Sequence, residues 1–204
     1  MIASDTAEFK SANKKDATVV LDGGEYNMGG NFSFAEGATI VGNGAVMTGG
    51  ALSNTIKNVT VKDVVFEGET AQRWAYAGGS VVFENCTFDA SSVYAIHYDG
   101  TAGADIVYKN CTIIGWAAIG GTPKSLTFEN CTIYGNGAYG CVRVYGDASF
   151  KDCTFDVSNV YATDGFQDGI HAVDCTVTVE NCTNVNGAIE DICHTSGTGA
   201  FIYK

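Results

Sequence analysis

The sequence predicts a right-handed parallel β-helix, a solenoid of about eight stacked coils that forms a single domain. Three observations predict it: an eight-residue pattern recurs along the chain, apolar residues alternate within each copy, and matching positions carry matching residue types. Of the 204 residues, 46% are hydrophobic and 26 are glycine, whereas proline occurs once. This composition is typical of one turn-rich domain, with residues 1–16 as an N-terminal cap and residues 17–204 as coils.

The recurring pattern is clearest at residues 81–88, which read Val-Val-Phe-Glu-Asn-Cys-Thr-Phe. It recurs at residues 106–113, 126–133, 148–155 and 177–184, with a fainter copy at residues 59–66. The offsets of about 20 to 29 residues match one coil of a solenoid. Within each copy apolar residues alternate, a polar corner follows, and the alternation then resumes. Each coil is therefore predicted to contain two short strands that meet at a bend.

Residues 5–13 are predicted to form a short helix that covers the open N-terminal end of the solenoid. Asp5 and Glu8 have the spacing of a capping box, in which side chains satisfy the free backbone N–H groups of the first turn. Solenoids need a cap because their terminal coil otherwise exposes its core. After the cap, residues 17–21 and 38–44 resemble degenerate first coils.

Two columns of residues are predicted to keep the coils in register, because equal positions of adjacent coils lie about 4.8 Å apart. The corner column holds short polar side chains that tolerate a left-handed backbone: Asp63, Asn85, Asn110, Asn130, Asp152 and Asn181. The outward column before it alternates in sign: Lys62, Glu84, Lys109, Glu129, Lys151 and Glu180. Each charge then faces opposite charges on both sides, which disfavours slipped pairings.

Five of the eight cysteines share one inward position after the corner: Cys86, Cys111, Cys131, Cys153 and Cys182. Val64 occupies this position in the preceding coil, which is the substitution expected of a small buried hydrophobe. A straight row of thiols cannot form a tetrahedral zinc site, and the spacings match no zinc motif. We therefore expect buried, reduced thiols with no disulfide and no metal. The Asn-X-Thr sequences at the corners are predicted not to be glycosylated, because the asparagines belong to the ladder.

The charge of the chain argues against two classes of partner. The formal net charge is −12, whereas binding to nucleic acid depends on clustered lysine and arginine. We expect no nucleic-acid partner and no association with an anionic membrane surface. No apolar stretch approaches the ~20 residues of a membrane span. The opening residues 1–5 lack the basic and apolar regions of a signal peptide, so we expect none in this chain.

The repeated Asn-Cys-Thr corner, the asparagine column and the opening segment from residue 18 to residue 44 resemble the pectin-lyase-like superfamily of right-handed β-helices. The resemblance covers nearly the whole chain and is specific for the fold. It implies no single activity, because the superfamily contains polysaccharide lyases, glycoside hydrolases, phage tailspike depolymerases, adhesins and non-catalytic modules. Members that cleave polysaccharides typically act on the face formed by the strand that precedes each repeat.

In this chain, that strand is predicted to carry a column of chemically capable side chains. Its inward residues are predicted to be Ile96, Ile119, Val142, Ile170 and Ile189. The next residue of each faces outward by alternation: His97, Gly120, Arg143, His171 and Glu190. The outward position before each inward residue is small: Ala95, Ala118, Cys141, Gly169 and Ala188. We interpret these columns as a groove that accommodates a polymer. The alternative is that they are ordinary polar surface positions.

Aromatic residues precede the same strand in three coils, at Tyr94, Trp116 and Tyr139. Exposed aromatic rings suit sugars, whose apolar faces stack on them, so these residues are predicted to form the edge of the groove. A plain aromatic stack that covers the coil edges explains them equally well.

The longest loop, residues 159–168, brings Asp164 and Asp168 near His171 in sequence. Its Thr163-Asp164-Gly165 is faintly similar to the Asn-Thr-Asp-Gly of pectin-type hydrolases, but Ala162 replaces the asparagine. Those hydrolases also place further aspartates and a Gly-His-Gly on successive coils, which this chain lacks.

The function expected from these residues is binding of a polysaccharide or cell-surface glycan, without catalysis, by a bacterial surface or phage protein. The predicted binding residues are His97, Trp116, Tyr139, Arg143 and His171. Short connections favour binding, because enzymatic sites usually lie on long loops of a rigid scaffold. The expected location is extracellular, at a cell surface or on a virion.

Two alternatives are open. The first is a polysaccharide lyase or glycoside hydrolase, with catalytic candidates His171, Arg143, Glu190, Asp164 and Asp168. The second is a structural spacer. No cofactor is expected, except that the lyase alternative allows Ca²⁺ held by clustered acids.

Overall fold

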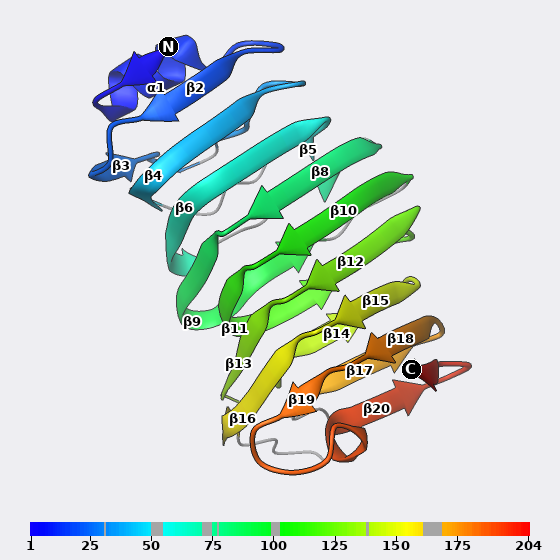
Figure 1. Ribbon diagram of the computed structural model, residues 1–204. Coiled ribbons are helices and arrows are strands. Elements are labelled where there is room, and N and C mark those ends of the chain that lie inside the picture. The colour runs from blue at the N-terminus through cyan, green and yellow to red at the C-terminus, as the bar shows by residue number, and fades with distance from the viewer. Residues whose placement is uncertain are drawn as a thin grey trace.

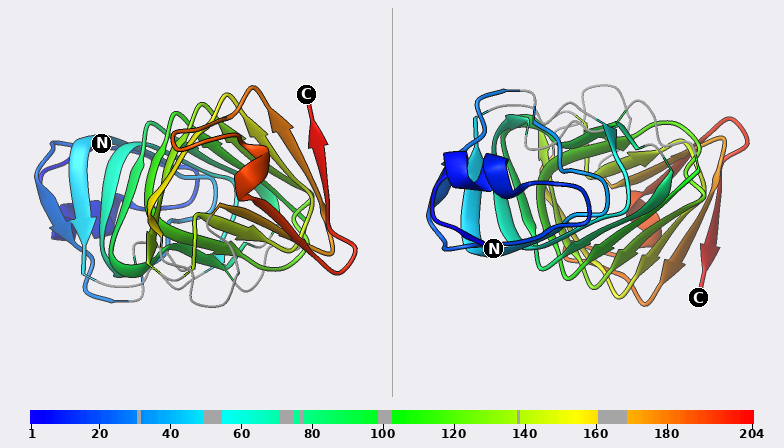
Figure 2. Two further views of the ribbon diagram at one scale, coloured as in Figure 1. Left: turned by 90° about the horizontal axis from the view of Figure 1, so that it is seen from below. Right: turned by 90° about the horizontal axis from the view of Figure 1, so that it is seen from above.

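The computed structural model is a parallel β-solenoid of about eight coils with one short helix near the N-terminus (Figure 1). It describes residues 1–30, 32–49, 55–70, 75–76, 78–98, 103–137, 139–160 and 169–204. The coils stack along one axis, and the two termini lie at opposite ends of the stack (Figures 1 and 2). The predicted all-β solenoid is thus confirmed. In the described part of the chain, no helix has the length and apolar character to cross a membrane.

Three rows of parallel strands run along the solenoid. The first row begins with β1 (Ile2–Ala3) and continues through β2 (Thr18–Leu21), β4 (Thr39–Thr48), β6 (Val59–Thr70), β8 (Gly79–Glu84), β10 (Ala104–Lys109), β12 (Ser125–Glu129), β15 (Ala148–Lys151), β18 (Thr176–Glu180) and β21 (Ala200–Tyr203). The second row contains β3 (Glu25–Asn27), the later parts of β4 and β6, β9 (Thr87–Tyr98), β11 (Thr112–Ile119), β13 (Thr132–Gly137), β16 (Thr154–Val160) and β19 (Thr183–Asn184).

The third row consists of the ends of β9 and β11 followed by β14 (Val142–Val144), β17 (Ile170–Val173) and β20 (Cys193–Ser196). A separate two-stranded sheet pairs β5 (Thr55–Ile56) with β7 (Ala75–Tyr76). A 3₁₀-helix, η1 (Glu190–Ile192), precedes β20. The third row is the strand that the sequence places before each repeat.

The core consists of inward columns, as the alternation predicts. In the first row, fully buried aromatic rings stack face to face from coil to coil. The ring centroids are 5.2 Å apart between Phe83 and Tyr108, 4.9 Å between Tyr108 and Phe128, and 4.7 Å between Phe128 and Phe150. Such a stack removes large apolar areas from water and fixes the spacing of the coils.

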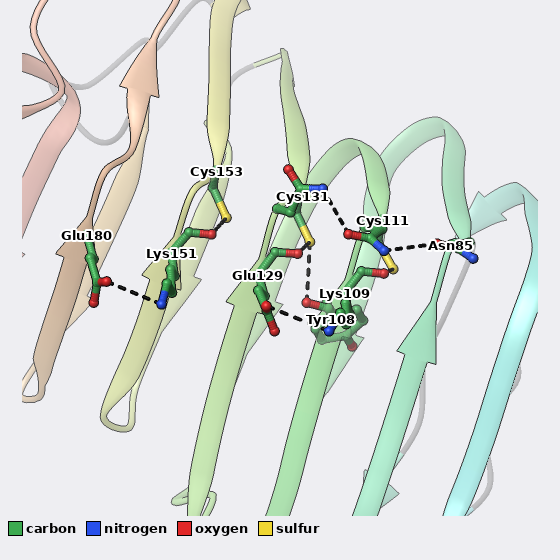
Figure 3. Close-up of polar contacts among 11 residues, drawn as sticks. Asn85, Tyr108, Lys109, Cys111, Glu129, Cys131, Lys151, Cys153 and Glu180 are labelled. Atoms are coloured by element: carbon green, nitrogen blue, oxygen red, sulfur yellow. Dashed lines mark hydrogen bonds and ion pairs between the residues drawn. The ribbon is translucent and has the colours of Figure 1, made fainter.

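The corner column is left-handed throughout, as predicted, with φ between 51° and 54° at all six positions. Its side chains form a hydrogen-bonded ladder. Asn85 Nδ2 donates to Asp63 Oδ1 at 3.1 Å. Asn110 Nδ2 donates in the same way to Asn85 Oδ1 at 3.1 Å (Figure 3). Asn130 donates in turn to Asn110 at 2.8 Å. Each coil therefore bends at the same place.

The alternating charges pair in register from Lys62 to Glu180, as predicted. Ion pairs join Lys109 to Glu129 at 3.7 Å and Lys151 to Glu180 at 3.4 Å (Figure 3). Sequence analysis missed the last member: Lys204 follows the final pair of β18 and β21 and its backbone bonds to both Val179 and Asn181. The alternation thus continues to the last coil.

The cysteine column faces inward, and Cys86, Cys111, Cys131 and Cys153 are buried as predicted. Cys182, in the same column, is only partly buried. Each thiol donates to backbone carbonyls, for example Cys131 Sγ to Tyr108 O at 3.4 Å (Figure 3). Hydrogen bonding with the thiol of the preceding coil and burial raise the pKa of Cys131 and Cys153 to about 12. None of the eight cysteines, all of which the structure describes, forms a disulfide.

The N-terminal helix α1 (Thr6–Ala12) covers the first coil, as predicted. Asp5 caps it by accepting a hydrogen bond from the Glu8 backbone at 2.8 Å. The Glu8 carboxylate reaches back to Ser4, whose backbone N–H and hydroxyl both donate to it. Phe9 is fully buried and packs against aromatic rings of the first coils. Strand β1 lies within the segment assigned to the cap, yet it pairs with β2.

We predict that Lys109→Glu destabilises the protein more than Lys109→Ala. The glutamate would stand between Glu84 and Glu129 on paired strands, whereas alanine only removes an exposed partner. Each like-charge contact costs roughly 0.2–1 kcal/mol. Urea denaturation at low salt measures the difference, and added salt should reduce it. Equal midpoints for the two variants would show that the charge alternation does not contribute.

We also predict that the thiols of Cys86, Cys111, Cys131 and Cys153 resist alkylation in the native protein. Burial blocks the reagent, and the raised pKa of Cys111, Cys131 and Cys153 keeps their reactive thiolate scarce. Intact mass after labelling should show eight adducts in denaturant and fewer under native conditions. Rapid native modification of Cys131, or a mass deficit from oxidation, would contradict the prediction.

Candidate functional site

The third strand row carries a column that differs from the predicted one. His97 pairs with Ala118, Ala118 with Arg143, Arg143 with His171, and His171 with His194. We call His97, Arg143, His171 and His194 the basic column. The predictions for Gly120 and Glu190 were therefore wrong, since Ala118 and His194 occupy those two positions.

A repeated dipeptide explains the misplaced residues. Ala118-Ile119 looks like Ala95-Ile96 in sequence, but Ile119 pairs with Tyr98 and Val144, and Ala117 is the partner of Ile96. Because of register shifts on either side of Trp116, the observed pairing differs from the predicted one by two residues. A difference of two preserves which way each side chain faces and changes only its partner.

The same dipeptide at Ala188-Ile189 also misled the assignment at the last coil. Cys193 takes the inward position predicted for Ile189, and Glu190 begins η1 instead of lying in the strand. His194 was missed for this reason. The sequence could have indicated His194, because it follows His171 by one coil length. With His194 included, all three histidines of the chain lie in one column.

The predicted open floor of small residues is also wrong. Ala95, Cys141, Gly169 and Ala118 are buried, and Ala118 pairs with His97 and Arg143, in register with the basic column. Gly169 is needed because a side chain there would overlap Ile192 of the next coil. The four buried residues pack the coils together, and of the five predicted floor residues only Ala188 is exposed, so they do not form a continuous open floor.

The aromatic residues form a continuous stack. The ring centroids of Tyr94 and Trp116 lie 5.0 Å apart, and those of Trp116 and Tyr139 lie 4.7 Å apart. Trp116 is only 6% exposed, because rings cover both of its faces. A sugar therefore cannot stack on Trp116, whereas Tyr139, at the end of this contact, is 44% exposed.

Arg143 is positioned by two aromatic residues. Its guanidinium carbon lies 5.4 Å from the centroid of the Trp116 ring, within the range of a cation–π contact. Its Nη1 donates to the Tyr145 hydroxyl at 3.5 Å. Tyr145 is 42% exposed, so Arg143 lies between two exposed tyrosines, Tyr139 and Tyr145, on one short segment of chain. Of the predicted binding residues, the structure brings Trp116, Tyr139 and Arg143 together.

The sequence predicts His171 as an exposed residue of the groove, but the structure buries it. It is 3% exposed, and its Nε2 lies 2.6 Å from the hydroxyl of Ser196. Burial lowers the pKa of His171, and the positive charges of Arg143 and His194 lower it further. The imidazole is therefore held neutral between two basic neighbours.

The other candidates are dispersed. His97 is partly exposed, and its ring centroid lies 4.5 Å from that of Tyr94. Glu190 is exposed on η1, outside the basic column. Asp164 and Asp168 lie outside the described residues. Among the described residues, no group of three or more histidine, cysteine or acidic side chains is arranged to hold a metal ion.

Comparisons with protein-family models, with curated proteins and with solved structures found no match to this chain. Function is therefore inferred from the residues of this chain and their geometry.

We predict that His171 makes the stability of the protein fall with decreasing pH. Its folded-state pKa lies below the ordinary value of about 6.5, so the unfolded chain takes up the proton first. The stabilisation is complete above the ordinary pKa and is lost as the pH falls through it. Between about pH 7.5 and about pH 5, the urea midpoint should therefore fall further for wild type than for His171→Gln.

Ser196→Ala is the matched control, because it removes the contact at Nε2 and leaves His171 in place. If burial is the main cause of the lowered pKa, this variant keeps the pH dependence of wild type. Equal pH dependence in wild type and His171→Gln would contradict the assignment.

Proposed function

We propose that this protein is a carbohydrate-binding β-helix module that binds a polysaccharide or cell-surface glycan without cleaving it. The observation that carries the proposal is that Arg143 bonds to the exposed Tyr145 and contacts the same Trp116 ring as the exposed Tyr139. Tyrosine rings offer apolar faces to sugars, and a guanidinium offers paired donors to hydroxyl or carboxylate oxygens. The binding surface centres on Arg143 and the two tyrosines, with His97 and His194 further along the basic column.

The anchoring of Arg143 supports binding. An unrestrained arginine loses rotamer freedom when a ligand fixes it, which weakens affinity. Here the Trp116 ring and the Tyr145 hydroxyl already restrict the guanidinium. The Arg143 side chain is therefore already ordered before a ligand binds, so binding costs less conformational entropy.

A polysaccharide lyase is the second candidate, because Arg143 and His171 pair on adjacent strands. A lyase needs a neutral base and a cation that stabilises the developing anion, and the lowered pKa of His171 suits the first role. However, His171 is buried and its Nε2 already contacts Ser196. These two facts favour binding over cleavage.

We also propose that the chain is related to the pectin-lyase-like superfamily and acts outside the cell, at a cell surface or on a virion. The parallel solenoid and the left-handed Asn-Cys-Thr corners support the first part. The burial and raised pKa of Cys111, Cys131 and Cys153 are compatible with an oxidising compartment, because thiolate is the species that oxidises. The net charge of −12 favours a glycan over a nucleic acid.

We predict that a glycan array detects binding by the wild type and that Arg143→Ala weakens it roughly 10- to 100-fold, the loss expected for a charged hydrogen bond. Arg143→Lys should recover only part of the affinity, because lysine keeps the charge and loses the paired donors. Lys151→Ala is the matched control, since it removes one positive charge from the first strand row.

Each bound glycan is then incubated with the protein and examined for shortened product. Binding that depends on Arg143, with intact product, supports the module. New reducing ends or unsaturated uronate absorbance that His171→Ala abolishes would replace it with the enzyme. If no glycan binds, the spacer alternative takes its place.

A further inference from the structure

The turns that connect the third strand row to the first differ in length from coil to coil. Between the residues that pair in register on either side of this connection, three successive coils have residues 120–125, 145–147 and 173–176, some of which are strand ends. The strands that flank these turns are paired in register. Counted between these paired residues, the middle connection is the shortest of the three.

A hollow of about 260 Å³ lies at this place. The short turn contributes residues 145–147, and the neighbouring turns contribute residues 122–124 and 174–175. We call this hollow the notch. A Cβ on Gly146 would lie 2.6 Å from Cδ of Pro123, the single proline of the chain, so glycine lets the short turn pass close to that ring.

Tyr145 connects the notch to the surface around Arg143. Tyr145 lines the notch and is 42% exposed, and its hydroxyl accepts a hydrogen bond from Arg143. Tyr145 is thus shared by the Arg143 surface and the notch, so a glycan held at Arg143 lies next to the notch.

Two carboxylates line the notch, one from each of two adjacent coils. Asp147 Oδ1 accepts a hydrogen bond from the Thr176 backbone at 2.8 Å, and Asp174 Oδ1 accepts one from the Thr198 backbone at 2.8 Å. Among the described residues, neither Oδ2 atom has a hydrogen-bond donor. Each carboxylate is thus held by one oxygen while the other is available to a ligand.

The electrostatics of the notch select against an acidic ligand. The ammonium of Lys124 is directed to Asp105 at 2.9 Å, where the two form an ion pair. The two aspartates are therefore the uncompensated charges of the notch, and they repel a carboxylate. A hydroxyl group, in contrast, donates to a carboxylate with a strong charge-assisted hydrogen bond.

We propose that the notch is a subsite for one neutral sugar residue of the bound glycan. The sugar rests an apolar face on Tyr145 and donates hydroxyl protons to Asp147 and Asp174. The volume of the notch is below the roughly 300–1,000 Å³ of pockets for drug-sized ligands, which suits one ring. This inference rests on the proposed function, and it adds that the glycan contains neutral residues.

The test measures affinity for the neutral oligosaccharides that bind on the array, with galacturonate oligomers as the acidic comparison. Tyr145→Ala should weaken binding of the neutral ligand about tenfold. Asp147→Asn and Asp174→Asn should each weaken it about tenfold as well, because they remove the charge that strengthens the hydrogen bond. Both amide variants keep the oxygen that accepts the backbone N–H, and asparagine tolerates the left-handed backbone of Asp174, whose φ is 52°.

Two variants outside the notch serve as matched controls. Tyr134→Ala removes a ring that is 38% exposed on β13, and Asp89→Asn removes a partly exposed carboxylate on β9. Both should bind the neutral ligand as tightly as wild type. Urea midpoints for all variants separate a loss of binding from a loss of folding.

The outcomes distinguish the notch from the proposed function. If Arg143→Ala and Tyr145→Ala weaken binding while Asp147→Asn and Asp174→Asn bind as tightly as wild type, the notch proposal fails and the binding module stands. The same conclusion holds if only acidic glycans bind. If no glycan of any kind binds, both proposals fail.

Discussion

The whole structure depends on the left-handed corner that follows the first strand row. At this corner a single residue with φ near 50° redirects the chain. Its side chain forms a hydrogen bond with the residue at the equivalent position of the adjacent coil, as Asn110 does with Asn85. The backbone N–H of Asn110 also donates to Glu129 O of the next coil, and Asn130 repeats this contact to Lys151. Because every coil bends at one place, equal positions stack. The aromatic, cysteine and charge columns all follow from that repetition.

A solenoid that fixes one corner leaves the other connections free to vary. The turns between the third and first rows differ in length without disturbing the paired strands on either side. Turns of unequal length create hollows and projections on a surface that is otherwise regular. The notch at residues 145–147 is an example of such a hollow. Specific chemistry in such a fold is therefore expected where coils differ, while the repeated positions provide stability.

The two columns of charged residues differ in how they place charges on adjacent coils. In the first row, lysine and glutamate alternate, so each rung attracts its neighbours. In the third row, Arg143, His171 and His194 are all basic, and the repulsion between them is limited because His171 stays neutral. The first arrangement stabilises register, whereas the second keeps a positive group at the surface of an acidic protein. This contrast is why the third row is the better candidate for ligand recognition.

The sequence by itself determined the solenoid, the capping helix, the corner ladder and the inward cysteines. These features follow from alternation with period two and from residue types that recur once per coil, so a single chain displays them directly. Tertiary structure alone decided which residues of the third row are neighbours, because register across the irregularity at Trp116 is set by strand pairing. It also decided burial: neighbouring rings cover Trp116, and packing withdraws His171 from the surface. Alternation says which way a side chain points, but only the folded chain determines what lies over it.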